Sequence, residues 1–255
     1  MSGSAITQPV GRAAVLAEEV KSGNVRAISR VITLLENQEP DAKEILRLLH
    51  NGRAASVIGV TGYPGAGKST LIDRLVAAYR GLGMKVGVLA VDISSHVTGG
   101  ALLGDRIRMQ SHAVGRDVYI RSMATRGHAG GLARATGAAA VVLEAAGYEV
   151  ILIETIGVGQ NDVDVMGLAQ TVLAVVAPGL GDEVQAMKAG LLEMAHIVVV
   201  NKGDHAGADS TLSDLREWCP MVLRTVATTG EGMPDLLSAI AEHQRMRDLR
   251  GQPGR

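Results

Sequence analysis

Residues 62–69 carry the pattern that most restricts how this chain can fold. They read GYPGAGKS and match the pattern G-x-x-x-x-G-K-[ST]. An apolar run at 57–60 indicates a buried strand before them, and an amphipathic run at 71–79 indicates a helix after them. Glycines let successive backbone N–H groups turn toward a polyphosphate, and the start of the helix adds partial positive charge. The sequence therefore predicts a nucleotide-phosphate loop between a strand and a helix.

Two side chains of this loop have predicted roles. Lys68 can reach the β- and γ-phosphates, so we expect it to act in catalysis, and the Ser69 hydroxyl can bind Mg²⁺. The expected nucleotide-binding residues here are Gly62, Tyr63, Pro64, Gly65, Ala66, Gly67, Lys68, Ser69 and Thr70.

Composition excludes several classes of partner. Aromatic residues make up 2% of the 255, the net charge is −1 and the pI is about 6.7, so neither a base-stacking platform nor a basic surface for nucleic acid is expected. No segment approaches a membrane span, and residues 1–10 lack a secretory pattern. The single cysteine, Cys219, rules out an intrachain disulfide. We expect a cytoplasmic protein that binds neither nucleic acid nor membrane.

The order of apolar patterns predicts the architecture. Residues 1–52 form a small helical appendage, 53–250 a nucleotide-binding domain and 251–255 a free tail. Predicted strands are 56–61, 85–91, 118–121, 149–154, 171–177, 196–201 and 221–226. Predicted helices lie between most of them and after the last one, at 70–80, 102–112, 130–146, 183–194, 209–218 and 234–247. Continuously apolar strands indicate a sheet covered on both faces. The predicted fold class is α/β, a doubly wound, mostly parallel sheet.

A carboxylate ends one of the predicted strands. Glu154 follows the apolar run 150–153, where related phosphate-binding enzymes anchor Mg²⁺. Gly157 lies three residues further on, so its N–H can approach the γ-phosphate. We expect Glu154 to bind metal and act in catalysis, and Gly157 to contact nucleotide.

The stretch NKGD at 201–204 directly follows another strand and indicates guanine recognition. The Asp204 carboxylate can accept hydrogen bonds from the ring N1–H and the exocyclic amine of guanine, a donor pair that adenine lacks. Lys202 is expected along the base plane, and Asn201 is expected to tie this loop to the phosphate side. Residues 225–227 stand where a backbone loop can support the base, although Val226 replaces the usual hydroxyl residue. The expected base contacts are Asn201, Lys202, Asp204, Val226, Ala227 and Thr228.

Two further acidic residues lie near the predicted phosphate site. Asp92 ends the second strand, and Asp105 follows a glycine-rich segment. Either can ligate Mg²⁺ or position the attacking water, and either can equally be a capping or surface-paired carboxylate. The histidines near these loops (His96, His112 and His128) form no metal-binding spacing.

Several of these motifs together resemble one known family. The segments 91–95, 99–109, 121–127, 130–136 and 154–160 read VDISS, GGALLGDRIRM, RSMATRG, GGLARAT and ETIGVGQ. In combination they resemble the MeaB/ArgK-type GTPases, which are G-protein chaperones of adenosylcobalamin-dependent acyl-CoA mutases. The resemblance extends from about residue 15 to residue 240.

The resemblance implies function that spacing alone does not. Members bind a mutase, use GTP binding and hydrolysis to gate delivery of adenosylcobalamin from an adenosyltransferase, and help to release damaged cofactor, which protects or reactivates the mutase. No obvious glutamine or arginine finger completes the site in this sequence, so we expect hydrolysis to be slow until the partner mutase stimulates it. The resemblance places Asp92, Asp105 and Glu154 at acidic switch positions, as catalytic residues and, with Ser69, as Mg²⁺ ligands. It also implies a partner switch at 178–188, with Asp182, Glu183 and Lys188.

The chain departs from the family pattern in two places. Ile93 replaces a usual proline, and we expect the chain to lack the helical arm through which many relatives dimerise. A homodimer is therefore an open expectation, as is the client, which can be a methylmalonyl-, isobutyryl- or 2-hydroxyisobutyryl-CoA mutase. Two other functions stay open: a P-loop phosphotransferase, and a GTPase that delivers nickel.

Overall fold

The computed structural model describes residues 11–50, 54–92, 117–124, 131–155, 160–179 and 191–251. In these ranges seven strands form one sheet in the order β3-β2-β4-β1-β5-β6-β7, and every neighbouring pair is parallel. The strands are β1 (Ser56–Thr61), β2 (Val86–Asp92), β3 (Val118–Ala124), β4 (Val150–Thr155), β5 (Thr171–Val176), β6 (Ile197–Val200) and β7 (Val222–Arg224). The doubly wound α/β fold predicted from the sequence is confirmed.

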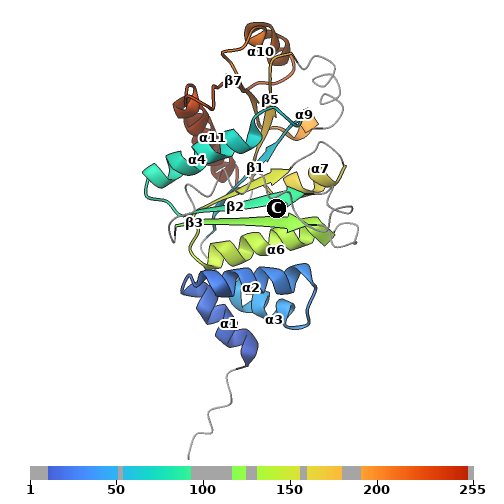
Figure 1. Ribbon diagram of the computed structural model, residues 1–255, viewed down its shortest axis with the longest axis vertical. Helices are drawn as coiled ribbons and strands as arrows, with labels where there is room; N and C mark the ends of the chain where they lie inside the picture. Colours follow the sequence, from blue (N-terminus) through green and yellow to red (C-terminus); the bar gives the residue numbers. More distant parts are fainter. Residues whose placement is uncertain are drawn as a thin grey trace, which may run out of the picture.

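Helices cover both faces of this sheet (Figure 1). The described helices are α1 (Arg12–Lys21), α2 (Val25–Glu36), α3 (Asp41–Leu49), α4 (Lys68–Gly81), α6 (Gly131–Ala145), α7 (Gln160–Met166), α9 (Leu191–Met194), α10 (Ala208–Arg216) and α11 (Met233–Leu249). Helix α6 packs on one face, and α4 and α11 pack on the other. The central strands β1, β4 and β5 are buried almost throughout, which is why they read as continuous apolar runs.

The three N-terminal helices form a layer outside α6 (Figure 1). The Asn24 side chain caps α2 by accepting from the backbone N–H groups of Arg26 and Ala27, so the polar residue sets where this helix begins. Apolar residues of α1, α2 and α3 join one core cluster with α6 and the adjacent face of the sheet. At the sheet edge, Arg121 of β3 makes an ion pair with Glu36 at the end of α2, at 2.5 Å. The domain division at residue 52 stays a prediction.

Element boundaries agree with the sequence to within about three residues, with one omission. The two-turn helix α7 was not predicted, because it offers only Val165 and Met166 as buried apolar residues and shows no helical period. The predicted helix 102–112 lies outside the described residues, as does most of the predicted helix 183–194, of which α9 is the end.

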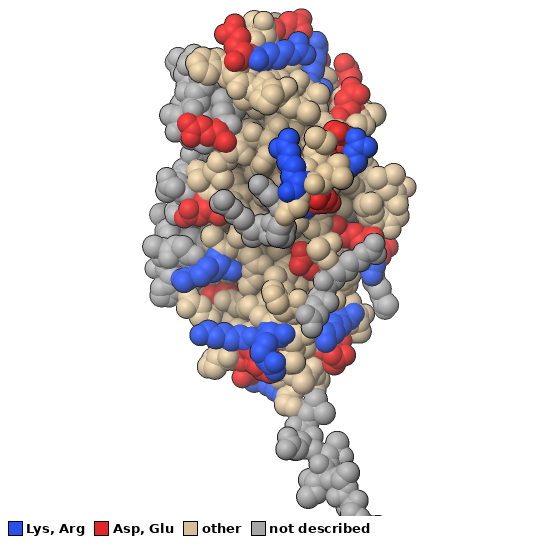
Figure 2. Space-filling model, turned by 180° about the vertical axis from the view of Figure 1, so that it is seen from behind, with Lys and Arg blue, Asp and Glu red and all other residues tan. Residues whose placement is uncertain are grey.

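Figure 2 shows basic and acidic side chains interspersed over one face of the molecule, in keeping with the net charge of −1. Among the described residues, every helix is too short or too polar to span a membrane.

Candidate nucleotide-binding site

The phosphate loop connects the central strand β1 to α4 and requires glycine at two positions. Gly62 has φ +137°, and a Cβ there would lie 2.0 Å from the carbonyl oxygen of Val175 on the neighbouring strand β5. Gly67 has φ +91°, and a Cβ there would lie 2.3 Å from Nδ2 of Asn201. Both conformations are costly for residues with a side chain. The glycines of the motif therefore allow the loop to pack closely against β5 and the 201–204 loop.

Lys68, the first residue of α4, directs its ammonium group back into the loop. Its Nζ donates to the carbonyl oxygens of Gly62 at 2.6 Å and Tyr63 at 3.1 Å, and the residue is only 7% exposed. The positive charge and the start of a helix thus lie together at the carboxyl end of β1, which is where doubly wound sheets bind ligands.

Ser69 and Glu154 meet beside this loop. Strand β4 pairs with β1 so that Glu154 lies opposite Val60, close to the start of the loop. The Ser69 hydroxyl donates to Oε1 of Glu154 at 2.8 Å, and Glu154 is 5% exposed. A hydroxyl and a carboxylate are hard oxygen ligands of the kind that Mg²⁺ takes, so this pair fits the ion.

Asn201 joins the two halves of the site. It is 2% exposed; its Nδ2 donates to the carbonyl oxygen of Ala66 at 2.9 Å. Its Oδ1 accepts from the Ala227 amide at 3.0 Å and from the Thr225 hydroxyl at 3.2 Å. One buried amide therefore fixes the phosphate loop, the 201–204 loop and the loop after β7 relative to one another.

These three loops enclose a small cavity of about 130 Å³. Lys202 has φ +55°, a left-handed conformation that non-glycine residues adopt mainly in tight functional turns. Asp204 is exposed to the cavity, whereas the Ala227 amide is occupied by Asn201. In the described part of the chain the Thr228 amide makes no hydrogen bond, so it is one of the backbone donors available at this cavity. The lining residues are Gly67, Thr70, Asn201, Lys202, Asp204, His205, Val226, Ala227 and Thr228.

Arg74, on α4, is a member of this site that sequence patterns did not indicate. Its Nε donates to the carbonyl oxygen of Ala227 at 2.7 Å, and its Nη2 donates to the carbonyl oxygen of Thr228. The helix that follows the phosphate loop therefore holds the loop that lines the base cavity. Arg74 and Ala227 are 153 residues apart, so no local pattern links them.

Several predicted site residues lie outside what the structure describes. Asp92 ends β2 as expected, but its side chain is not among the described ones. Asp105, Gly157, Asp182, Glu183 and Lys188 lie outside the described residues, as do His96, His112 and His128. Their roles stay predictions.

Comparison with known proteins agrees with this geometry. Residues 28–255 match the family model described as "Methylmalonyl Co-A mutase-associated GTPase MeaB". A putative GTPase of Pyrococcus abyssi is 50% identical over 252 residues, covering 93% of this chain and 78% of that protein. GTPase ArgK of Escherichia coli is 34% identical, covering 90% of this chain and 76% of that protein.

A solved structure supports the same relationship. The crystal structure titled LAO/AO transport system kinase is 25% identical, with a TM-score of 0.74, and covers 96% of this chain and 79% of that one. The phosphate loop, the NKGD loop and the matched length of sequence agree, and the chain belongs to the MeaB family of P-loop GTPases.

Proposed function

We propose that this protein binds GTP in preference to ATP and hydrolyses it slowly. The observation that supports this most is the buried Asn201, which connects a phosphate loop to a cavity whose accessible carboxylate is Asp204. A carboxylate there accepts the N1–H and exocyclic N–H of guanine, and the Thr228 amide can donate to the guanine O6. Adenine has an acceptor at N1 and an amine in place of O6, so it fits neither the carboxylate nor the amide and the same site rejects it.

Hydrolysis would depend on positive charge that the folded protein already holds at the phosphate site before GTP binds. Lys68 supplies positive charge to the β- and γ-phosphate oxygens, and the loop amides supply further donors. Ser69 and Glu154 would hold Mg²⁺, which when bound adds positive charge at the same oxygens. Asp92, Asp105 and Glu154 are the candidates for orienting the attacking water, and the Gly157 amide for sensing the γ-phosphate.

We further propose that the GTPase cycle serves an adenosylcobalamin-dependent acyl-CoA mutase. Support comes from the family description, which names a methylmalonyl-CoA mutase association, and from the segment 178–188 that resembles a partner switch. Asp182, Glu183 and Lys188 are its charged candidates, and an adenosyltransferase is the expected cofactor donor. Hydrolysis should be slow alone and faster with the mutase; equal, fast rates in both conditions would contradict this role.

Exchange of the base-reading carboxylate tests the guanine assignment directly. Asp204→Asn replaces two acceptors with one acceptor and one donor, which suits xanthine, whose C2 oxygen accepts a hydrogen bond. We expect GTP affinity to fall by about 100-fold or more and xanthosine triphosphate to become the preferred ligand. Asp209→Asn, which changes a nearby exposed carboxylate paired with Arg224, is the matched control and should keep the GTP preference. A D204N protein that still prefers GTP would refute the assignment.

Two other functions have distinct outcomes in simple assays. The solved relative is described as a transport system kinase, so a phosphorylated acceptor and a preference for ATP would favour phosphotransfer over hydrolysis. Nickel delivery would require tight, stoichiometric Ni²⁺ binding. Within the described ranges, no group of three or more His, Cys, Asp or Glu side chains is placed to hold a metal.

A further inference from the structure

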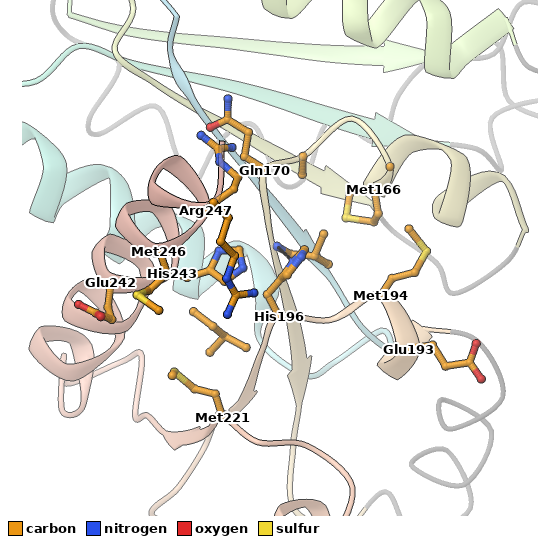
Figure 3. Close-up of a pocket in the computed structure, with 15 residues that line it drawn as sticks. Met166, Gln170, Glu193, Met194, His196, Met221, Glu242, His243, Met246 and Arg247 are labelled. Carbon is orange, nitrogen blue, oxygen red and sulfur yellow. Dashed lines mark hydrogen bonds between the residues drawn. The ribbon is translucent and has the colours of Figure 1, made fainter. Parts of the chain in front are cut away.

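A second and larger cavity lies at the opposite edge of the sheet from the nucleotide site. It has a volume of about 570 Å³ and is bounded by the starts of β5 and β6, the end of α7, α9 and the last turns of α11 (Figure 3). The phosphate loop follows the carboxyl end of β1, whereas this cavity touches Val172 and Ile197 at the amino ends of their strands. Its volume lies within the range of small-molecule sites.

The cavity has an adaptable apolar wall. Met166, Met194, Met221 and Met246 come from four different segments and surround it in Figure 3. Val172 is a further apolar lining residue. Methionine side chains are flexible and polarizable, so such a wall can adjust to apolar groups of different shape. This part of the cavity suits a hydrocarbon body.

The polar groups that converge on the cavity are mostly hydrogen-bond donors. The rings of His196 and His243 lie 4.3 Å apart, centroid to centroid. Nδ1 of His196 accepts from the Val172 amide at 3.0 Å, so the neutral ring carries its proton on Nε2 and is a donor there. Burial lowers the pKa of His196, and the nearby charge of Arg247 lowers it further. The pair is therefore neutral at pH 7.

Arg247 adds a guanidinium group beside the two rings (Figure 3). Its side chain is 19% exposed, and its Nη1 is buried without a hydrogen-bond partner in the described part of the chain. Its ion pair with Asp248 uses Nε and Nη2 and involves a carboxylate that is 70% exposed. An unpaired buried donor is unfavourable, so a ligand acceptor that reached Nη1 would gain a hydrogen bond that the described part of the chain does not supply.

The charges around the cavity favour an anion over a cation. Arg250 lies close enough to lower the pKa of His243. Of the two lining carboxylates, Glu242 pairs with Arg245, which is not a lining residue, and Glu193 projects from α9 on the other side. Two guanidinium groups beside neutral imidazoles would repel a metal ion but attract a carboxylate or phosphate.

We propose that this cavity is a second ligand site, which binds a small amphipathic anion with its carboxylate or phosphate at Arg247 and His196 and its apolar body against the methionines. This inference is independent of the nucleotide assignment, because none of these residues touches the base cavity or the phosphate loop.

The test compares four probes on the full chain by calorimetry and by NMR of the imidazole C–H groups. Octanoate, octyl phosphate, octanol and inorganic phosphate separate the contributions of the head group and the chain. For a probe of about ten heavy atoms, a typical ligand efficiency implies a Kd below about 10 mM. We expect octanoate or octyl phosphate to bind with shifts at His196 and His243. The stronger of the two identifies the head group, and octanol and inorganic phosphate should bind at least about fivefold more weakly.

Two variants locate the binding. Arg247→Gln should weaken the preferred octyl anion by about 10-fold, because it removes a charge-assisted contact. Arg245→Gln removes one positive charge from the same helix outside the cavity and should change binding by less than about twofold. GTP affinity should be the same in both variants and in the parent protein.

The proposal is overturned if neither octyl anion binds, if octanol binds as tightly as the stronger octyl anion, or if R245Q weakens binding as much as R247Q. The comparison of that anion with octanol needs only the parent chain, so it decides even if R247Q does not fold. If the protein fails these tests but binds GTP normally, only the proposal of a second ligand site is wrong, and the nucleotide assignment stands.

Discussion

Replacing Asn201 with alanine should both destabilise the protein and weaken GTP binding, because one side chain makes three buried hydrogen bonds between separate loops. At about 1 kcal/mol for each bond, the loss is about 3 kcal/mol, and the Ala66 carbonyl and Ala227 amide are left unpaired. For a chain of this size that corresponds to a fall in Tm of roughly 6–12 °C.

The same loss should appear in nucleotide affinity, since the phosphate loop and the base cavity would no longer be held together. We expect GTP to bind about 10- to 100-fold more weakly, the upper limit applying if the whole 3 kcal/mol is expressed in binding. Fluorescence titration with a labelled GTP analogue, alongside thermal unfolding, measures both effects.

Asn24→Ala provides the matched control. Asn24 also uses its side chain for two backbone N–H groups, but as an exposed cap of α2 in the N-terminal layer. Its loss should cost about 1 kcal/mol and leave GTP affinity unchanged. If N201A is no less stable than N24A, or binds GTP normally, then the three bonds do not organise the site and the reasoning fails.

Three further changes have expected outcomes. Gly62→Ala places a Cβ 2.0 Å from a carbonyl oxygen of β5 and should lower the free energy of unfolding, measured in urea, by about 3 kcal/mol or more. Gly65→Ala, with φ +80° and open space around it, should lower it by only about 1–2 kcal/mol. Equal losses in the two variants would contradict the close packing of Gly62 against β5. Arg74→Met frees the carbonyls of the base loop and should weaken GTP binding about 10-fold, mainly through faster dissociation in stopped-flow traces; an unchanged dissociation rate would contradict this. Folding lowers the pKa values of His196 and His243 below the ordinary 6.5, so below about pH 6.5 the unfolded chain binds more protons and stability falls as the pH drops. Tm should therefore decrease as the pH is lowered from about 7.5 to 5.5, and a variant with both histidines changed to glutamine should show a smaller decrease. An equal decrease in that variant would show that the two histidines are not the source of the pH dependence.

Local sequence patterns were sufficient to predict the fold class and the two loops that form the phosphate-binding and base-binding ends of the nucleotide site. Strand–helix alternation predicted all seven strands, because strands buried on both faces are continuously apolar and the helices between them are amphipathic. The short helix α7 was missed because two turns contain too few buried residues to show a period. The GKS and NKGD motifs were readable because phosphate and guanine each require particular residues at adjacent positions in one loop.

The sequence by itself therefore determined which chemical groups this protein carries and in what kind of sheet. The tertiary structure decided which of them meet: Ser69 with Glu154, 85 residues apart, Arg74 with the loop after β7, and Asn201 with both loops. The second cavity also exists only in three dimensions, because His196 precedes β6 whereas His243 and Arg247 lie on α11. Contacts of this kind depend on strand order and helix packing, which bring distant residues together without leaving a pattern along the chain.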